Sequence, residues 1–289
     1  MAKRRLDTLL VDRGLAENQK KARALLLSGA VSLGERPAPK AGILVDEDTP
    51  LRVAEPRRYV GRGGEKVEHA LDVFGLDVTG LVVADIGAST GGFTDCLLQR
   101  GASRIYAIDA GKGQLDYRLR CDERVVVMEG VNARKLETLP EPMDFVAVDV
   151  SFIPLRLILP AGRTLLADPR REMRATSASA SGSIVALFKP QFEARKDEVP
   201  RGGVVRDAQL HATLIGRFST WCVANGFRIL NLTSSPILGA DGNREFLFWL
   251  RPTQIPTPAG RVLARARDAQ SHYGLHPIPS AARIKRFRA

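Results

Sequence analysis

The first fifty residues place apolar positions at the spacing of short helices. Leu6, Leu9 and Leu10 stand at i, i+3 and i+4, which predicts a helix, and Gly14 is placed to end it. Asn18 is the expected N-cap of a second helix. Short stretches of β-forming residues follow at 31–33, 43–45 and 51–53. Because so short a chain encloses little core, residues 1–55 predict a small α+β module rather than an enzyme.

From residue 81 onward, runs typical of buried strands alternate with helical stretches. Strands are expected at 82–86, 104–109, 125–128, 144–149, 184–188, 227–233 and 245–250. Helices are expected at 93–101, from about residue 154, and at 207–224. This alternation predicts an α/β fold with a Rossmann-like, doubly wound and largely parallel sheet over residues 67–251.

Three segments lack this periodicity. Residues 56–66 (PRRYVGRGGEK) are basic and rich in glycine, so we expect a linker there. Residues 170–183 are polar and low in complexity, which predicts a mobile surface insertion. Residues 251–289 contain eight Lys+Arg, one Asp and several prolines. We therefore expect residues 252–289 to form a basic, partly disordered tail that adds contacts to RNA.

The charge balance points to an anionic partner. The chain has 43 Lys+Arg against 32 Asp+Glu, a net charge of +11 and an isoelectric point near 10.0. Such an excess favours nucleic acid, although on charge alone a basic protein without this partner is the alternative. No run approaches the roughly 18 apolar residues of a membrane span, and the N-terminus lacks the apolar core of a signal peptide. We expect a soluble protein.

The cysteines, Cys96, Cys121 and Cys222, are far apart and lack the spacing of metal ligands. We therefore expect no metal site. Unpaired thiols are typical of a reducing compartment, so the expected location is the cytoplasm.

A glycine-rich turn follows the first strand of the alternating region. In DIGASTGG (85–92), the glycines let the backbone turn tightly and approach a ligand closely. The spacing D-x-G-x-x-x-G-G differs from the G-x-G-x-x-G of dinucleotide enzymes, and alone it is weak evidence for a nucleotide site. Asp109 ends the next strand, where a carboxylate can accept hydrogen bonds from two ribose hydroxyls.

Two more polar residues complete the expected cofactor site. Asp85 is placed to face a methionine ammonium group, and Asn132 to contact an adenine edge, although a polar turn residue is the simpler explanation of Asn132. Two acidic strand ends suit a cationic sulfonium nucleoside better than a diphosphate, so we expect S-adenosylmethionine as the cofactor. The expected contacts are Asp85, Gly87, Ser89, Gly91, Gly92, Phe93, Asp109, Asn132 and Asp149.

Four ionisable residues stand where an α/β sheet gathers its ligands. Asp149 and Lys189 each end a strand, and the carboxyl ends of parallel strands share one crevice. Lys66 follows VGRGGE, and Glu245 opens the last strand. Ordinary surface ions are the alternative, most of all for Lys66 and Glu245. A lysine directly after an apolar strand and before a proline is harder to explain in that way.

The N-terminal module resembles a known RNA-binding unit. The stretch RLDTLLVDRGLAENQKKARALLLSGAVSLGERPAPKAGILV is similar to the αL RNA-binding module named after a ribosomal small-subunit protein. That family usually has Ser-Arg where Asn18 and Gln19 stand, and Asn where Leu33 stands, so Lys20 and Lys21 are expected to replace a missing basic contact. The expected RNA contacts are Arg4, Arg5, Arg13, Lys20, Lys21, Arg23 and Arg62.

Nearly the whole chain resembles the TlyA (hemolysin A) family of ribosomal RNA methyltransferases, whose catalytic domain is FtsJ-like. The matching stretches are VGRGGEK, DIGASTGGFTDCLLQ, DVSFIPL, LFKPQFEA, GGVVRD and SPILGADGN. The resemblance implies a Lys-Asp-Lys-Glu catalytic tetrad, which falls on Lys66, Asp149, Lys189 and Glu245. The chain departs from the family at Gly61, where Ser is usual, and in the 170–183 insertion.

The resemblance also implies the reaction, a displacement at the sulfonium methyl by a ribose 2′-hydroxyl, with a cytidine of ribosomal RNA as target. A hydroxyl is a poor nucleophile, so a base must take its proton. Lys189 serves only as a neutral amine, a form that burial favours and Asp149 opposes. We expect Asp149 to orient Lys189 and face the methyl donor, and Lys66 and Glu245 to position the ribose.

Three other functions fit parts of the sequence. A non-catalytic RNA-binding or ribosome-assembly factor would keep the fold, but the complete tetrad argues against it. A membrane-active hemolysin needs an apolar span or a strongly amphipathic segment, and neither is found. A base-modifying methyltransferase often carries a catalytic Cys or an Asn-Pro-Pro-Tyr-like loop where this chain has DVSFIP (149–154). The expected partner is ribosomal RNA or a ribosomal subunit, bound by a monomer.

Overall fold

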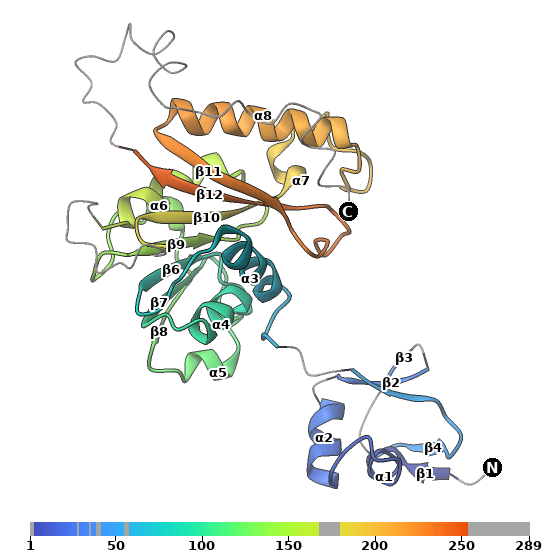
Figure 1. Ribbon diagram of the computed structural model, residues 1–289. Coiled ribbons are helices and arrows are strands. Elements are labelled where there is room, and N and C mark those ends of the chain that lie inside the picture. Colours follow the sequence, from blue (N-terminus) through green and yellow to red (C-terminus); the bar gives the residue numbers. More distant parts are fainter. Residues whose placement is uncertain are drawn as a thin grey trace, which may run out of the picture. The chain divides into compact units, whose positions relative to one another are not determined.

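The computed structural model describes residues 3–27, 29–34, 36–38, 42–54, 58–167 and 180–253 (Figure 1). The chain divides into two compact units, Met1–Arg58 and Tyr59–Ala289. Each unit has its own hydrophobic core, so each is described by itself.

The N-terminal unit packs two helices against short strands. Its elements are β1 (Lys3–Arg5), α1 (Leu6–Asp12), α2 (Gln19–Leu27), β2 (Val31–Leu33), β3 (Arg36–Pro37), β4 (Leu44–Asp46) and β5 (Leu51–Val53). Asn18 Oδ1 accepts a hydrogen bond from Lys21 N at 2.9 Å, so Asn18 caps α2 as expected. Strand β1 was not predicted, because KRR has no apolar alternation and only its antiparallel pairing with β4 makes it a strand.

The second unit is built on a seven-stranded sheet. Its strands are β6 (Val82–Ile86), β7 (Arg104–Asp109), β8 (Val125–Glu129), β9 (Phe145–Val148), β10 (Ser183–Phe188), β11 (Phe227–Ser234) and β12 (Phe246–Pro252). They lie in the order β11-β12-β10-β9-β6-β7-β8, and β12 runs antiparallel to both neighbours. The central pairs, including β6 with β7 and with β9, are parallel. This topology confirms the predicted Rossmann-like, doubly wound fold.

Helices cover both faces of this sheet (Figure 1). They are α3 (Gly63–Phe74), α4 (Gly92–Gln99), α5 (Tyr117–Arg120), α6 (Leu159–Leu165), α7 (Pro190–Glu193) and α8 (Ala208–Ala224), with short 3₁₀ helices η1 (Ala133–Lys135) and η2 (Leu155–Leu157). Helices α3 and α4 pack with one set of strand residues, including Val83 and Phe145. Helices α6 and α8 pack with the alternate set, including Ala84 and Val146. Successive strand residues point to opposite faces, which explains why these central strands are apolar throughout.

The expected linker at 56–66 is wrong for residues 59–66, which belong to the second unit. Tyr59 is 3% exposed within the core, and α3 already begins at Gly63. A Cβ on Gly64 would lie 2.3 Å from Tyr59 Cγ, and Val60 N donates to Asp95 Oδ2 at 2.8 Å. The glycines that suggested a flexible linker therefore serve close packing. Residues 56 and 57 lie outside the described part of the chain.

The expected insertion and tail fall mostly outside the described residues, which omit 168–179 and 254–289. The last residues assigned to the insertion are part of the fold instead. Ala180 is fully buried, its N–H donates to Asp77 O at 2.9 Å, and Ser183 begins β10. Among the helices that the structure describes, none combines the length and the apolar character needed to cross a membrane.

The aromatic core beneath β10 and β12 should dominate the stability of the second unit. The ring of Phe248 is fully buried and lies 4.8 Å from that of Phe218 and 5.5 Å from that of Phe188, between centroids. We expect Phe248→Ala to lower the free energy of unfolding by about 3–5 kcal/mol in urea denaturation. Val73→Ala, on the exposed side of α3, should change it by less than about 0.5 kcal/mol. Equal losses in the two variants would contradict this packing.

Candidate active site

The glycine-rich turn after β6 is shaped by close contacts with the protein itself. Gly87 has φ +91°, and a Cβ there would lie 2.2 Å from Asp149 O. Gly91 has φ +97°, and its Cβ would lie 2.1 Å from Leu119 Cδ1. The backbone N–H groups of Gly87 and Ala88 both donate to Ile108 O. The turn therefore requires glycine at 87 and 91, both for φ and for space.

Asp109, expected to contact a ribose, holds this turn in place. Its Oδ2 accepts a hydrogen bond from Ser89 N and its Oδ1 from Gly111 N, both at 2.7 Å. Ser89 has φ +49°, a left-handed conformation that non-glycine residues rarely adopt, so the bond to Asp109 supports a strained position. A carboxylate offers about four acceptor positions, which leaves room for ligand hydroxyls.

Asp85 lies at the end of β6, beneath the turn. It is fully buried; its Oδ2 accepts a hydrogen bond from Thr94 Oγ1 at 2.6 Å, and its Oδ1 has no hydrogen-bond partner in the described protein. Burial raises the pKa of Asp85 to about 7, and nearby Asp149 adds to the rise. An unpartnered buried oxygen is costly, and a cation beside it would remove that cost.

The residues expected to act in catalysis gather at one edge of the sheet. Asp149 directly follows β9 and Lys189 directly follows β10. Glu245 directly precedes β12, and because β12 runs antiparallel to β10 its start lies at that same edge. The ladder pair Phe188 with Phe246 places Lys189 and Glu245 next to each other on facing strands.

The four side chains form two ion pairs. Lys66 Nζ, in the first turn of α3, is 2.5 Å from Glu245 Oε2. Lys189 Nζ is 2.7 Å from Asp149 Oδ1, and it donates to Ser151 Oγ at 2.8 Å. Both lysines are more than nine-tenths buried. An isolated buried charge costs several kcal/mol, so each lysine depends on its carboxylate partner.

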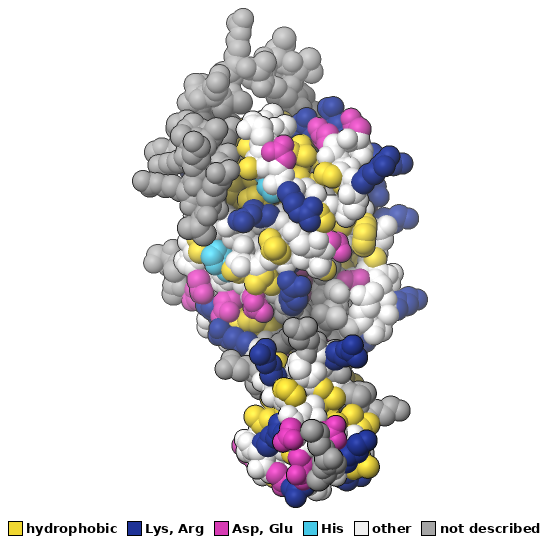
Figure 2. Space-filling view, turned by 90° about the vertical axis from the view of Figure 1, so that its right-hand side faces the viewer, with side chains coloured by type: hydrophobic (Ala, Val, Ile, Leu, Met, Phe, Trp, Pro, Cys, Tyr) yellow, Lys and Arg dark blue, Asp and Glu magenta, His cyan; other side chains and the backbone are white. Residues whose placement is uncertain are grey.

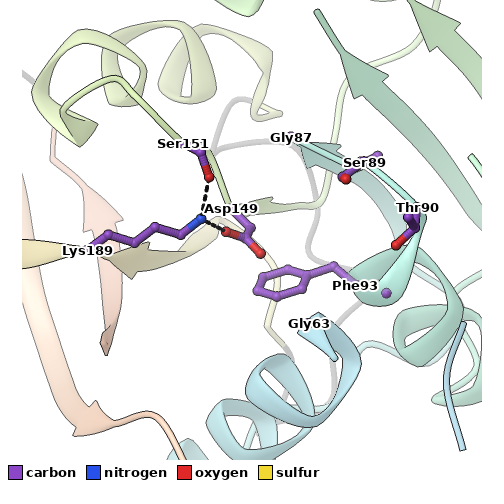
Figure 3. Close-up of a pocket in the computed structure, with 10 residues that line it drawn as sticks. Gly63, Gly87, Ser89, Thr90, Phe93, Asp149, Ser151 and Lys189 are labelled. Carbon is purple, nitrogen blue, oxygen red and sulfur yellow. Dashed lines mark hydrogen bonds and ion pairs between the residues drawn. The ribbon is translucent and has the colours of Figure 1, made fainter. Parts of the chain in front are cut away.

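A pocket separates the glycine-rich turn from the Lys189–Asp149 pair (Figure 3). Its empty volume is about 540 Å³, which includes solvent at the open mouth. The lining residues are Gly63, Gly87, Ala88, Ser89, Thr90, Gly92, Phe93, Asp149, Ser151 and Lys189. Lys189 Nζ points toward Asp149 and Ser151 on one side, with Ser89 and Thr90 across the pocket. Gly63 lies three residues before Lys66 on α3, so the second ion pair adjoins the same pocket.

Comparison with known proteins identifies the family. The family model described as FtsJ-like methyltransferase matches residues 59–252, which is most of the chain.

The chain belongs to the FtsJ-like methyltransferase family.

Named relatives and a solved structure agree with this assignment. The 16S/23S rRNA (cytidine-2′-O)-methyltransferase TlyA of Mycobacterium tuberculosis is 41% identical over 256 residues, covering 87% of this chain and 91% of the relative. Hemolysin A of Brachyspira hyodysenteriae is 39% identical over 247 residues, covering 84% and 98%. A solved structure from Streptococcus thermophilus is 40% identical with a TM-score of 0.65, covering 89% of this chain and 90% of that one. The resemblance to the TlyA family is thereby confirmed.

Several expected cofactor contacts of this FtsJ-like methyltransferase lie away from the pocket lining. Asp85 accepts a hydrogen bond from Thr94 in α4, and Gly91 packs against Leu119. Asp109 lies on the next strand and accepts a hydrogen bond from Ser89 N in the turn. Asn132 is exposed, and its Oδ1 accepts a hydrogen bond from Arg134 N at 3.1 Å, capping η1. The observed role of Asn132 is therefore that of a turn residue, and its contact with adenine stays a prediction.

Sequence reasoning missed Ser151, which lines the pocket, and Glu129, which lies beside Asp109 on the neighbouring strand. Ser151 follows β9 and accepts a hydrogen bond from Lys189, which follows the neighbouring strand β10. The register of these two strands sets this contact, and no sequence pattern around Ser151 predicts it. Glu129 ends β8, where its carboxylate accepts hydrogen bonds from the N–H groups of Gly113, Gln114 and Leu115 at 2.7–3.2 Å. Arg120 together with these donors lowers the pKa of Glu129 to about 2. The rule that singled out Asp109, an acidic residue at a strand end, also applies to Glu129.

The basic residues of the N-terminal unit largely serve its fold. Arg5 and Arg23 both pair with the buried carboxylate of Asp7, and Arg5 is the main cause that lowers the Asp7 pKa to about 2. Arg13 donates to the carbonyl oxygens of residues 47 and 49, and Arg4 pairs with the carboxylates of residues 12 and 47. Figure 2 shows acidic and basic side chains intermingled on this unit.

Among the expected RNA contacts, Lys20 and Lys21 on α2 are exposed, and no ion pair holds either one within the described residues. Arg62, in the second unit, donates to Leu238 O at 2.5 Å. RNA contact by these side chains remains a prediction.

The close approach of Gly87 to Asp149 O should make glycine at this position necessary for the stability of the fold. Gly87→Ala would force a Cβ against Asp149 O, whereas Gly80→Ala, with a similar φ of +74°, would meet nothing within 4 Å. We expect Gly87→Ala to lose about 1–3 kcal/mol of unfolding free energy beyond the loss in Gly80→Ala, as measured by urea denaturation. The difference isolates the contact from the backbone penalty that both share, and identical losses would rule the contact out as its source.

Proposed function

We propose that the chain uses S-adenosylmethionine to methylate the 2′-hydroxyl of a cytidine ribose in ribosomal RNA. The observation that carries this proposal is the placement of Lys189 Nζ, held by Asp149 and Ser151 at the wall of a pocket whose other wall is the glycine-rich turn. The name of the Mycobacterium tuberculosis relative supports the cytidine 2′-hydroxyl as the target. The net charge of +11 supports an RNA substrate.

The residues present fit S-adenosylmethionine. The unpartnered Oδ1 of Asp85 suits the methionine ammonium group, and the remaining acceptor positions of Asp109 suit the ribose hydroxyls. The backbone of the turn would contact the cofactor at Gly87 and Gly92, which line the pocket together with Ser89 and Phe93, and Asn132 would lie at the adenine. When bound, the cofactor supplies an electrophilic methyl group on a positively charged sulfur.

The chain's own residues then act on the ribose. Lys189, as the neutral amine, takes the proton of the 2′-hydroxyl as it attacks. Asp149 fixes the direction of Nζ through the ion pair and faces the methyl donor. Holding both reactants in line can contribute about 7–11 kcal/mol to catalysis.

The second ion pair positions the ribose. Lys66 Nζ has donors left after it binds Glu245, because an ammonium group carries three hydrogens. A Cβ on Gly239 would lie 2.5 Å from Glu245 Oε1, so the chain encloses this carboxylate closely and limits its movement. Lys66 and Glu245 therefore offer a rigid donor and acceptor next to the pocket.

The rest of the chain serves recognition of the large RNA. The N-terminal unit would bind RNA through Lys20 and Lys21, while the arginines around Asp7 maintain its fold. The enzyme would act as a monomer in the cytoplasm, where ribosomal RNA is found. A non-catalytic RNA-binding factor would bind the same RNA without transferring a methyl group, so methyl transfer separates the two functions.

Removal of the base should stop the reaction. We expect Lys189→Ala to reduce transfer of tritiated methyl groups to ribosomal RNA by about 100-fold or more. Affinity for S-adenosylmethionine, measured by calorimetry, should stay within about threefold, since Lys189 acts on the ribose rather than on the cofactor. Lys196→Ala removes an exposed lysine seven residues later and should leave the rate unchanged. Normal transfer by Lys189→Ala would show that another group is the base.

Binding of the cofactor should depend on pH through Asp85. Its pKa is raised to about 7, so much of it is protonated below pH 7, whereas a bound cation requires the ionised form. Binding thus releases a proton, and affinity should rise from pH 6 to about pH 8 and then level off. Calorimetry across this range, with Asp85→Asn as comparison, checks the cause. Asp85→Asn should bind more weakly and lose the rise, and an equal rise in both proteins would exclude Asp85.

A further inference from the structure

Two segments that follow neighbouring strands run side by side next to the pocket. One continues β9 through residues 149–155 into η2, and the other continues β10 through residues 189–193 as α7. Lys189 joins them near the pocket through Asp149 and Ser151. Farther along, the rings of Phe152 and Phe192 lie 5.0 Å apart between centroids. A third contact between the two segments is made by Glu193, whose Oε1 accepts a hydrogen bond from Leu155 N at 2.6 Å.

The segment after β9 needs support from outside itself. Phe152 has φ +63° and is 89% exposed, so its strained backbone gains little from burial of its own side chain. Such a conformation costs about 1–3 kcal/mol and persists only where surrounding contacts hold it. Pro154 precedes η2 and has no side-chain acceptor to cap it. The N–H of Leu155 would otherwise lack a partner, and Glu193 supplies one.

Glu193 is a buried carboxyl group that the proposed chemistry does not use. Its side chain is 6% exposed, and it does not line the pocket. Arg156 Nη1 lies 3.9 Å from Glu193 Oε2, too far for a hydrogen bond, and the Arg156 side chain is half exposed. On the α8 side, the thiol of Cys222 is fully buried; burial, and to a lesser extent the nearby Glu193, raises the pKa of this thiol. Burial raises the pKa of Glu193 to about 7.

We infer that Glu193 is a positioning residue for methyl transfer, which holds the 149–155 segment at Leu155 and thereby keeps Ser151 and Asp149 against Lys189. This inference rests on the proposed function. Glu193 acts through its acceptor oxygen, since the bond it makes is to a backbone N–H and its nearest cation is distant and solvent-exposed. A glutamine keeps that oxygen and the side-chain size, whereas a leucine keeps only the size.

The test uses the full-length protein with ribosomal RNA and S-adenosylmethionine. We expect Glu193→Leu to lower kcat by about 10- to 100-fold, since a misplacement of about 1 Å can cost about 100-fold. The KM for S-adenosylmethionine should change by less than about threefold, because the glycine-rich turn is untouched. Glu193→Gln should retain kcat within about twofold of the wild type, because the acceptor remains.

Glu198 provides a matched control on the same stretch of chain. Its carboxylate also accepts a backbone N–H, from Arg195 at 2.9 Å, and pairs with Arg217, but no hydrogen bond or ion pair joins it to the 149–155 segment among the described residues. Glu198→Leu should lower the melting temperature without lowering kcat. A double-mutant cycle of Ser151→Ala with Glu193→Leu should be non-additive, because both changes act on the position of Lys189.

The outcomes distinguish the inference from the proposed function. Wild-type kcat in Glu193→Leu, or equal losses of kcat in Glu193→Leu and Glu193→Gln, would overturn the positioning role. The same follows if Glu198→Leu loses kcat as much as Glu193→Leu does, because the effect would then reflect general stability. A wild-type protein that transfers no methyl group to ribosomal RNA would overturn the proposed function itself, and the role of Glu193 with it.

Discussion

The structure depends on the contact between the glycine-rich turn and the end of β9. Strands β6 and β9 are parallel neighbours, and Asp149 N donates to Ile86 O just beyond their ladder. Gly87 then passes so close to Asp149 O that no side chain fits. Because of this approach, the glycine-rich turn and Asp149, which both line the pocket, share a backbone contact.

The antiparallel direction of β12 brings the fourth ionisable residue, Glu245, to the same edge of the sheet as Asp149 and Lys189. Ligands gather at the carboxyl ends of parallel strands, and Asp149 and Lys189 follow that rule. Glu245 comes before its strand rather than after it, and it reaches the same edge only because β12 reverses direction. Its pairing with Lys66 then connects α3 to the start of β12. Residues 179 positions apart in the sequence thus meet beside Lys189.

The buried charges contribute position more than stability. Removing lysine and carboxylate side chains from water costs several kcal/mol for each ion, which the attraction within a pair only partly offsets. The Lys66–Glu245 and Lys189–Asp149 pairs are therefore explained by what they hold in place. In the N-terminal unit the pairs around Asp7 lie between half-exposed arginines and a buried carboxylate, and they tie β1, α1 and α2 together. Arg5 and Arg23, which suggested RNA contact, therefore stabilise the N-terminal unit by pairing with Asp7.

The sequence by itself determined the alternation of strands and helices, the glycine-rich turn and the strand-end positions of Asp85, Asp109, Asp149 and Lys189, because these follow from local periodicity and from residue types next to it. It pointed to Lys66 and Glu245 through the family resemblance, since they lie 179 positions apart. Only the tertiary structure decided that residues 59–66 pack rather than link, that Arg5 and Arg23 converge on Asp7, that Ser151 binds Lys189 and that Glu193 binds the N–H of Leu155. These contacts arise from strand register and from backbone N–H groups left unpaired at loop ends, neither of which has a signature in the residues nearby.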